Sequence, residues 1–337
     1  MDNEIKEPKT LQEAFILFSD PDVCLKYLAK KRWPDGIIPC PTCGRTDVTF
    51  LPTQRKWQCK SRHDHRQFSV KVGSIYEDSP LGLDKWLTAT WMLTNDKNGI
   101  SSYEIHRALK VTQKTAWFMM HRIRKAMNTN SFMNKMGANG NGVEVDETFI
   151  GGKARNMHKS VRARRITGTG PKDKTAVMGI LERGDKAKGT HSKVVTMVVP
   201  DRKKKTLQTE VKEHVAAGAA LYSDALLSYD GLEKEFAHEV VDHAVEYVRG
   251  LVHTNGTENF WSLTKRTLGG TYVSVEPFHL FRYLDEQSFR FNNRGTRMIP
   301  VNDSDRFQLV MSQVAGKRLT YKELTGKLEK EKQDAAF

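Results

Sequence analysis

The sequence lacks any long hydrophobic run. No apolar segment among its 337 residues approaches the roughly 18 residues that a membrane-spanning helix needs. The first ten residues, MDNEIKEPKT, are polar and of mixed charge, so they do not resemble a signal peptide. Internal repeats are absent as well. These absences argue against membrane and secreted classes, and we expect a soluble, cytoplasmic protein.

Cysteines are also few, and acidic residues are outnumbered by basic ones. The chain has four cysteines, Cys24, Cys40, Cys43 and Cys59. Without a secretory signal a disulfide framework is not expected, and a metal site is the better interpretation. Asp and Glu number 40 against 54 Lys and Arg, which leaves a formal net charge of +14. Such a surplus suits a polyanionic partner such as nucleic acid.

Composition changes along the chain divide it into segments. Two short capped helices come first, and the cysteines then lie among the β-like runs VTFL, KWQC and QFSVKV. A strongly helical stretch and an Asn- and Gly-rich linker follow. From residue 142 the runs GVEVDETFI, AVMGILER, KVVTMVV and ALYSDAL are predicted strands, and helices are expected after about residue 225. We predict a helical segment (1–35), a zinc ribbon (36–80), a helix-turn-helix domain (81–128), a linker (129–141), an α/β domain (142–300) and a helical or disordered tail (301–337).

The sequence CPTCG at 40–44 is a C-x2-C knuckle, and Gly44 allows the tight turn below a metal. Structural Zn²⁺ takes four tetrahedral thiolate or imidazole ligands. Cys59 supplies a third ligand, but no fourth cysteine follows it at the usual spacing. His63 is the favoured fourth ligand, with His65 as the alternative. Cys24 lies within a helical pattern and is expected in the core.

Residues 101–127 have the layout of a helix-turn-helix. One helix turns Ile105 and Leu109 inward, a turn follows at Lys110 and Val111, and Thr112 caps a second helix. A recognition helix meets base edges with its N-terminal residues, which here are Gln113, Lys114 and Thr115. Further along that helix lie cations expected to contact phosphates, namely His121, Arg122, Arg124 and Lys125.

Acidic residues stand in two predicted strands. In GVEVDETFIGG the alternation puts Glu144 and Asp146 on one face, and Asp224 ends the strand in AALYSDAL. Acidic residues are unfavourable inside strands, so two such aspartates suggest carboxylates aimed at a shared point. Mg²⁺ or Mn²⁺ prefers carboxylate oxygen, and two ions about 3.5–4 Å apart are suited to phosphodiester chemistry.

A third carboxylate is expected from HTNGTENFWSLTKR at 253–266, a helix beginning near Thr254 or Asn255. Spacings of three and four put Asn255, Glu258, Trp261, Ser262 and Lys265 on one face. This face suggests a wall lining a polyanion site, with Glu258 on metal and Lys265 near phosphate. His253 either approaches the scissile phosphate or caps the helix, and Trp261 is either a DNA contact or a packing residue.

The neighbouring acidic residues are interpreted as non-catalytic. Glu147 points to the opposite face of its strand and is expected to be structural, whereas Glu144 and Asp230 are expected to be solvated. The basic segment 151–174 is expected to form a DNA-contacting loop beside the first aspartate. The cations that we assign to DNA there and on the later helix are Lys153, Arg155, Arg162, Arg164, Arg165 and Arg266.

Several long motifs occur in a fixed order, VEVDETFIGGK, LYSDALLSY, HTNGTENFWSLTKR and FRYLDEQSFRFNNR. Together they resemble the DDE-type transposases of small bacterial insertion sequences. The most similar group has an N-terminal zinc ribbon, a helix-turn-helix and an ISXO2-like transposase domain. The resemblance covers nearly the whole chain, and QFSVKVGSIYEDSPLGLDKW and GKRLTYKELTG extend it.

The resemblance implies a multidomain α/β protein with a ribonuclease H-like core, a mixed sheet flanked by helices. It implies that Asp146, Asp224 and Glu258 form the acidic triad on Mg²⁺, supports His63 on zinc, and makes Asn255 an auxiliary residue. The expected activity is cleavage at terminal inverted repeats and strand transfer into target DNA, in a dimer or larger assembly at the nucleoid. A DNA-binding regulator, a nuclease that does not join strands and an inactive descendant are the alternatives.

Overall fold

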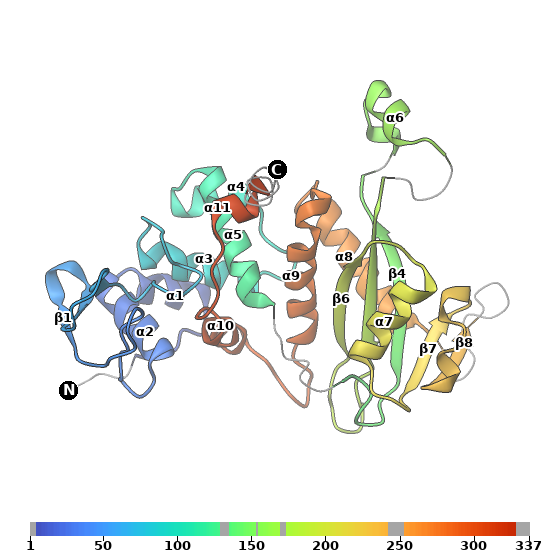
Figure 1. Ribbon diagram of the computed structural model, residues 1–337, viewed down its shortest axis with the longest axis horizontal. Helices are drawn as coiled ribbons and strands as arrows, with labels where there is room; N and C mark the ends of the chain where they lie inside the picture. Colours follow the sequence, from blue (N-terminus) through green and yellow to red (C-terminus); the bar gives the residue numbers. More distant parts are fainter. Residues whose placement is uncertain (1–4, 129–134, 153, 169–172, 242–252, 328–337) are drawn as a thin grey trace. The chain divides into compact units, whose positions relative to one another are not determined.

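The computed structural model describes residues 5–128, 135–152, 154–168, 173–241 and 253–327 (Figure 1). The chain divides into two compact units. The first contains Met1–Met127 together with Asn302–Phe337, and the second is Asn128–Val301. Within the described ranges no helix has the length and apolar character to cross a bilayer.

The first unit is built around a set of packed helices. Helix α1 (Leu11–Phe18) is capped by Thr10, and α2 (Pro21–Arg32) by Asp20. Both pack against α3 (Leu83–Asn95). Aromatic rings fill the space between these helices and α10 (Asp303–Ser312), and they belong to Phe18, Tyr27, Trp91 and Phe307.

A small antiparallel sheet follows α2. It contains β1 (Val48–Leu51), a 3₁₀ turn at Pro52–Gln54, β2 (Lys56–Cys59) and the short β3 (Gln67–Phe68). The first two strands are the runs VTFL and KWQC of the sequence prediction. The third is shorter than predicted, because after Phe68 the chain leaves the sheet.

The predicted pair of helices is present as α4 (Ser102–Leu109) and α5 (Gln113–Met127). Helix α4 begins with a capping box between Ser101 and Glu104, and the turn bends at Lys110, whose φ of 50° is left-handed. The hydroxyl oxygen of Thr112 accepts the backbone N–H of Thr115, as expected of a cap. Ile105 and Leu109 are buried, as predicted.

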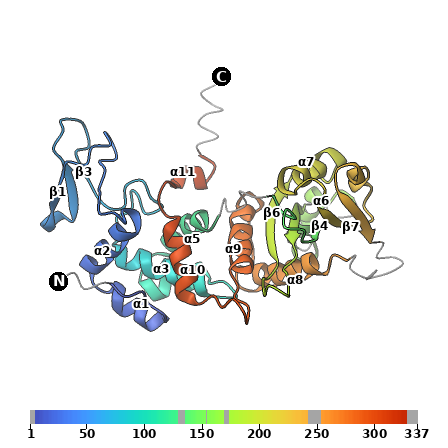
Figure 2. The ribbon, with the colours of Figure 1, turned by 90° about the horizontal axis from the view of Figure 1, so that it is seen from below.

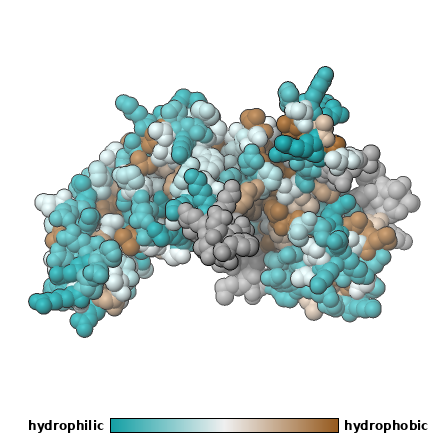
Figure 3. Space-filling model, turned by 45° about the horizontal axis from the view of Figure 1, so that its top comes forward, coloured by the Kyte–Doolittle hydropathy of each residue, from teal (hydrophilic) through white to brown (hydrophobic). Residues whose placement is uncertain are grey.

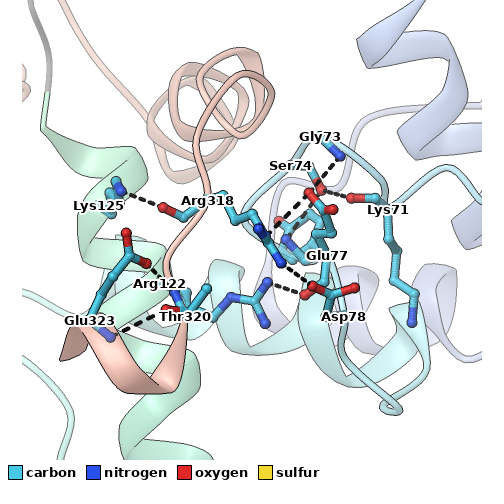
Figure 4. Close-up of polar contacts among 11 residues, drawn as sticks. Lys71, Gly73, Ser74, Glu77, Asp78, Arg122, Lys125, Arg318, Thr320 and Glu323 are labelled. Atoms are coloured by element: carbon cyan, nitrogen blue, oxygen red, sulfur yellow. Dashed lines mark hydrogen bonds and ion pairs between the residues drawn. The ribbon is translucent and has the colours of Figure 1, made fainter. Parts of the chain in front are cut away.

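The C-terminal residues belong to the first unit rather than forming a separate tail. Helix α10 packs on α3, and α11 (Tyr321–Leu324) lies on α5, where the Tyr321 ring meets Phe118. Figure 4 shows how Arg318 fastens this segment: its guanidinium donates to Asp78 at 2.5 Å, and its carbonyl oxygen accepts from Lys125. Of the predicted tail at 301–337, residues 328–337 lie outside the described residues.

The second unit is organised by a five-stranded mixed sheet in the order β6-β5-β4-β7-β8. Its strands are β4 (Val143–Ile150), β5 (Thr175–Glu182), β6 (Lys193–Val199), β7 (Ala220–Asp224) and β8 (Ala237–Val241). Strands β4, β5 and β6 pair antiparallel, whereas β7 and β8 extend the sheet in parallel. The first four match the predicted runs. After about residue 225 only helices were expected. This was wrong, because a further strand, β8, lies there.

Helices cover both faces of this sheet (Figure 2). Helix α7 (Lys204–His214), which the sequence reading missed, buries Leu207 and Val211 on one face. Helices α8 (Asn255–Gly270) and α9 (Leu280–Asn292) pack on the other, with a 3₁₀ turn at Pro277–His279 between them. The strand alternation therefore sends Val143 and Val145 toward α7, and Glu144 and Asp146 toward α8.

The described part of the predicted linker at 129–141 is packed into the second unit. Residues 129–134 lie outside the described residues. Met136, however, is buried in the α7-side core and pairs with Val215 in a parallel bridge. Gly137 packs closely against Ala219 and Val143. The chain from 135 onward is thus part of the second unit, because these apolar contacts fix it there.

Beyond the sheet, the β4–β5 connection carries a 3₁₀ turn (Ala154–Asn156) and α6 (Lys159–Arg165). Helix α6 has no buried residue, and its surface is strongly hydrophilic in Figure 3. The segment 151–174, which was expected to be a loop, therefore contains a short helix without buried residues.

Candidate active site

The sheet brings the two predicted aspartates to neighbouring strands. Strand β4 runs on to Ile150, but its parallel pairing with β7 covers only Val143–Val145 against Leu221–Ser223. Asp146 and Asp224 are the next residue on each strand, so they stand side by side where the two strands cease to pair. Asp224 also accepts the backbone N–H of Leu226 at 3.2 Å, which starts the turn after β7.

Glu258 lies in the first turn of α8, as predicted, and is exposed. Helix α8 packs on β4 and β5, so its N-terminal turn reaches the carboxylate face of the sheet. The close fit depends on Gly179, which pairs with Asp146 across the ladder. A Cβ at Gly179 would lie 2.6 Å from the Trp261 ring. Trp261 is 4% exposed, which makes it a packing residue.

The charges of the other two acidic groups act on Asp146. Burial, and then the charges of Asp224 and Glu258, raise the pKa of Asp146 from 3.8 to about 6. The Trp261 indole N–H favours the charged form of this carboxyl, although Nε1 makes no hydrogen bond of normal geometry. A carboxyl whose ionisation is opposed by two others is a site that a cation would stabilise.

Glu147 adds a fourth carboxyl to this region. Burial raises its pKa to about 8, the charges of Asp224 and Asp146 reinforce that shift, and Arg202 opposes it. Its Oε1 is buried without a hydrogen-bond partner among the described groups. This environment favours the uncharged form of Glu147, which the strand pattern alone did not suggest.

The expectation that Glu144 is solvated was wrong. Its side chain is 1% exposed because α8 covers that face of β4. Its carboxylate accepts from Arg183 Nε at 2.7 Å and from the backbone N–H of Thr257 at 2.9 Å. Asp230, in contrast, is exposed as expected.

His253 lies just before α8 and contacts Arg183. Arg183 Nη2 lies 3.0 Å from His253 Nδ1 and donates to its carbonyl oxygen at 2.6 Å. Because a guanidinium only donates, Nδ1 accepts and the ring proton is on Nε2. Burial and Arg183 lower the pKa of His253, so the ring is neutral at pH 7.

The polar stripe predicted on α8 is exposed, apart from Trp261. Asn255, Glu258, Ser262 and Lys265 are all exposed, as is Arg266 on the adjacent position. Trp261 instead joins the core that α8 and α9 form with the sheet.

The predicted zinc ligands gather in the first unit. One ligand atom from each of Cys40, Cys43, Cys59 and His63 lies within 4.8 Å of every other. His63 Nδ1 lies 2.6 Å from the Asp64 carbonyl oxygen and Nε2 is 3.5 Å from the Cys40 sulfur, so Nε2 is the ring atom turned to the thiols. A hydrogen bond with His63 lowers the pKa of Cys59 to about 6.

This donor set suits Zn²⁺, which binds thiolates and an imidazole oriented by a carbonyl. His65 is not in the group, so the geometry favours His63. Cys24 is buried in α2, where its thiol donates to the Phe18 carbonyl oxygen, as expected of a core residue. Asp146, Asp224 and Glu258 do not form so tight a group.

The residues predicted to read DNA begin helix α5. Gln113 donates to the Ser102 hydroxyl at 2.9 Å, the Lys114 ammonium sits over the Tyr321 ring, and Thr115 contacts Thr112. Lys114 is exposed and the other two are half-buried.

The cations further along α5 do not match the prediction. Arg122 is 3% exposed, donates to the Glu77 carbonyl oxygen and stacks on Trp86. His121 and Arg124 are buried too, because this face of α5 packs into the first unit. Their assignment to phosphate contact is therefore wrong. On the β4–β5 connection Arg155, Arg162, Arg164 and Arg165 are exposed, whereas Lys153 lies outside the described residues.

Comparison with known proteins identifies two family domains in this chain. Residues 138–292 match the ISXO2-like transposase domain, and residues 19–64 match the transposase zinc-ribbon domain. A transposase-like protein of Haemophilus influenzae is 35% identical over 102 residues, which cover 30% of this chain and 82% of that protein. This chain belongs to the ISXO2-like transposases.

A second relative of this transposase comes from Halobacterium salinarum. It is a protein in transposable element ISH50, 28% identical over 259 residues, or 72% of this chain and 81% of that protein. No solved structure matches the transposase. The zinc-ribbon match covers the segment with the Cys and His cluster, and the transposase-domain match covers the mixed sheet. Membership of this family implies that the transposase binds DNA.

Proposed function

We propose that this transposase binds the terminal inverted repeats of its insertion sequence, cuts the DNA there and joins the exposed 3′ end to target DNA. The observation that carries the proposal is the placement of Asp146 and Asp224 at the ends of the β4–β7 pairing, with Glu258 in the first turn of α8. Burial and the charges of Asp224 and Glu258 raise the pKa of Asp146. The mixed sheet flanked by helices supports a ribonuclease H-like core.

These three carboxylates are the groups that would hold Mg²⁺ or Mn²⁺, which prefer such oxygens. When bound, the ions would activate the attacking oxygen and stabilise the leaving one. Bound cations would offset the repulsion between Asp146 and its two acidic neighbours, and this favours metal binding. The protein's own contribution is then positioning and charge, since phosphoryl transfer needs little covalent work from side chains.

The exposed stripe of α8 supplies the positioning groups. Lys265, two turns beyond Glu258, pairs with a phosphate of the DNA strand, and Arg266 binds beside it. Asn255, one turn before Glu258, is a polar auxiliary residue. His253 is neutral, and its Nε2–H is available to donate to a phosphate oxygen.

Recognition of the repeats is assigned to the first unit. The zinc ribbon and the α4–α5 pair form the DNA-binding region, with Gln113, Lys114 and Thr115 facing base edges. The arginines of the β4–β5 connection bind DNA near the cleavage site, because that connection starts from the strand that carries Asp146. Two ends must be brought together for transfer, so the active complex is at least a dimer.

A strand-transfer assay with Mg²⁺ tests the proposal. Labelled DNA carrying the element's terminal repeats is incubated with a plasmid target and with wild type, Asp146→Asn, Glu258→Gln or Glu239→Gln. Glu239 is an exposed carboxylate on β8, so its variant is the matched control and should act as wild type. Cleaved and joined products should vanish in the first two variants.

Full activity in Asp146→Asn or Glu258→Gln contradicts the triad. Wild type that cleaves without joining identifies a nuclease, and binding without cleavage identifies a DNA-binding regulator or an inactive descendant.

A further inference from the structure

Glu144 is a buried carboxylate that the proposed chemistry does not use. It stands on β4 two residues before Asp146, on the same face of the strand, and α8 covers it. A buried carboxylate needs hydrogen bonds and a countercharge. Glu144 has both, because Oε1 accepts from Arg183 Nε at 2.7 Å and Oε2 accepts from the Thr257 N–H at 2.9 Å.

The bond to Thr257 replaces a missing helix cap. The first N–H groups of any helix lack partners inside it, and a side chain at the N-cap usually accepts one of them. In α8 the N-cap is Thr254, whose side chain makes no capping hydrogen bond. Thr257 is the third helical residue, the position that such a cap serves, and Glu144 accepts its N–H instead. A carboxylate there also interacts favourably with the positive end of the helix dipole.

Arg183 holds this carboxylate in place. It follows β5, and its guanidinium stacks on the Tyr222 ring at 4.3 Å from the centroid. The same guanidinium donates to the His253 carbonyl oxygen at 2.6 Å, which ties the chain just before α8 to the sheet. Glu144 and Arg183 together therefore hold the start of α8 on the sheet, through Thr257 inside the helix and His253 just before it.

The contact also explains a glycine. A Cβ at Gly256 would lie 2.7 Å from Glu144 Oε2 and 3.1 Å from Oε1. Such a distance is shorter than real Cβ atoms show, and the carboxylate cannot swing away without losing Arg183 and Thr257. The helix approaches the strand this closely because residue 256 has no side chain.

We propose that Glu144 is a positioning residue that sets where Glu258 stands relative to Asp146. The hydrogen bond joins a residue two places from Asp146 to the residue next to Glu258. The spacing of two carboxylates on different elements is thereby fixed by one buried contact. This inference rests on the proposed function, because it takes Asp146 and Glu258 as metal-binding groups.

The test measures cleavage of repeat-containing DNA by the full-length protein as Mg²⁺ is varied. Glu144→Gln keeps the volume but removes the charge that pairs with Arg183 and the helix dipole. We expect the half-saturating Mg²⁺ concentration to rise at least tenfold, with DNA affinity unchanged. Mn²⁺ should partly restore the rate of Glu144→Gln but not that of Glu258→Gln, which lacks a metal-binding group. The control Glu239→Gln should titrate as wild type.

Gly256→Ala provides a second variant that alters no charge and keeps the proposal testable if Glu144→Gln folds poorly. Helix propensity alone predicts that alanine stabilises α8. The proposed contact predicts instead that the half-saturating Mg²⁺ concentration rises, as it does for Glu144→Gln. The two substitutions should also be less than additive together, since they disturb one contact.

Folded Glu144→Gln or Gly256→Ala with the wild-type Mg²⁺ dependence overturns the positioning role. Wild type that does not cleave overturns the proposed function instead, so the two failures are distinguishable.

Discussion

At the scale of single residues, Asp146 combines burial with two acidic neighbours, and this sets a pH dependence. Its pKa is about 6 in the folded chain and about 3.9 when unfolded, so the folded state disfavours the charged form. Metal-free protein therefore loses stability as pH rises through this window and does not regain it at higher pH.

Asp146→Asn should abolish that loss. In metal-free buffer at pH 7 the variant should be more stable than wild type, by about 3 kcal/mol, and at pH 3 the two should converge. Thermal unfolding across the pH range measures the difference. Asp230→Asn, at an exposed position of the same unit, is the control and should change little. A variant less stable than wild type at pH 7 contradicts the electrostatic account.

The choice between two histidines gives a second prediction at this scale. His63→Ala should lose the zinc ion, because it removes the imidazole turned to the three thiols. His65→Ala should retain about one zinc per chain. Zinc content of the purified variants, measured by mass spectrometry, decides the matter. Retention by His63→Ala with loss by His65→Ala reverses the assignment.

Among residues, the sequence revealed the type of chemistry better than it revealed burial. Alternation put Glu144 on the face of Asp146, but nothing local showed that α8, 113 residues further on, covers that face. Similarly, Arg122 looked like a phosphate contact, although α5 turns it toward Trp86. Both errors concern long-range packing, which charge and periodicity do not encode.

At the scale of elements, helices and strands with a strong apolar pattern were predicted correctly, and those with a weak pattern were missed. Strands β4, β5 and β6 are rich in apolar residues and agree with the prediction. Helix α7 buries only Leu207 and Val211, and β8 is a five-residue edge strand with exposed Glu239 and Val240. Neither has the apolar stripe that marks an element in a single sequence.

Helix α10 gives the prediction at this scale, since it completes the helical part of the first unit from the far end of the chain. Phe307 is fully buried against Phe18, Tyr27 and Trp91. Phe307→Ala should reduce the stability of this unit by about 3–5 kcal/mol, as for other buried aromatic truncations. Hydrogen exchange in α1, α2 and α3 measures it. Gln308→Ala, on the same helix but only partly buried, is the control, and unchanged protection in Phe307→Ala contradicts this role for α10.

At the scale of the whole molecule, the formal net charge of +14 makes DNA binding dependent on salt. Each phosphate that a cation neutralises adds about 0.9 to the slope of log affinity against log salt. Replacing Arg162, Arg164 and Arg165 of α6 by alanine should therefore lower that slope by about 2.7 if all three contact phosphates. A control that replaces Lys186, Lys188 and Lys193 removes the same charge from other exposed positions of the second unit. Affinity for end-containing DNA, measured over a range of salt, separates contact from net charge. A direct role requires a smaller slope for the arginine variant alone, and equal slopes for the two variants would show that only net charge matters.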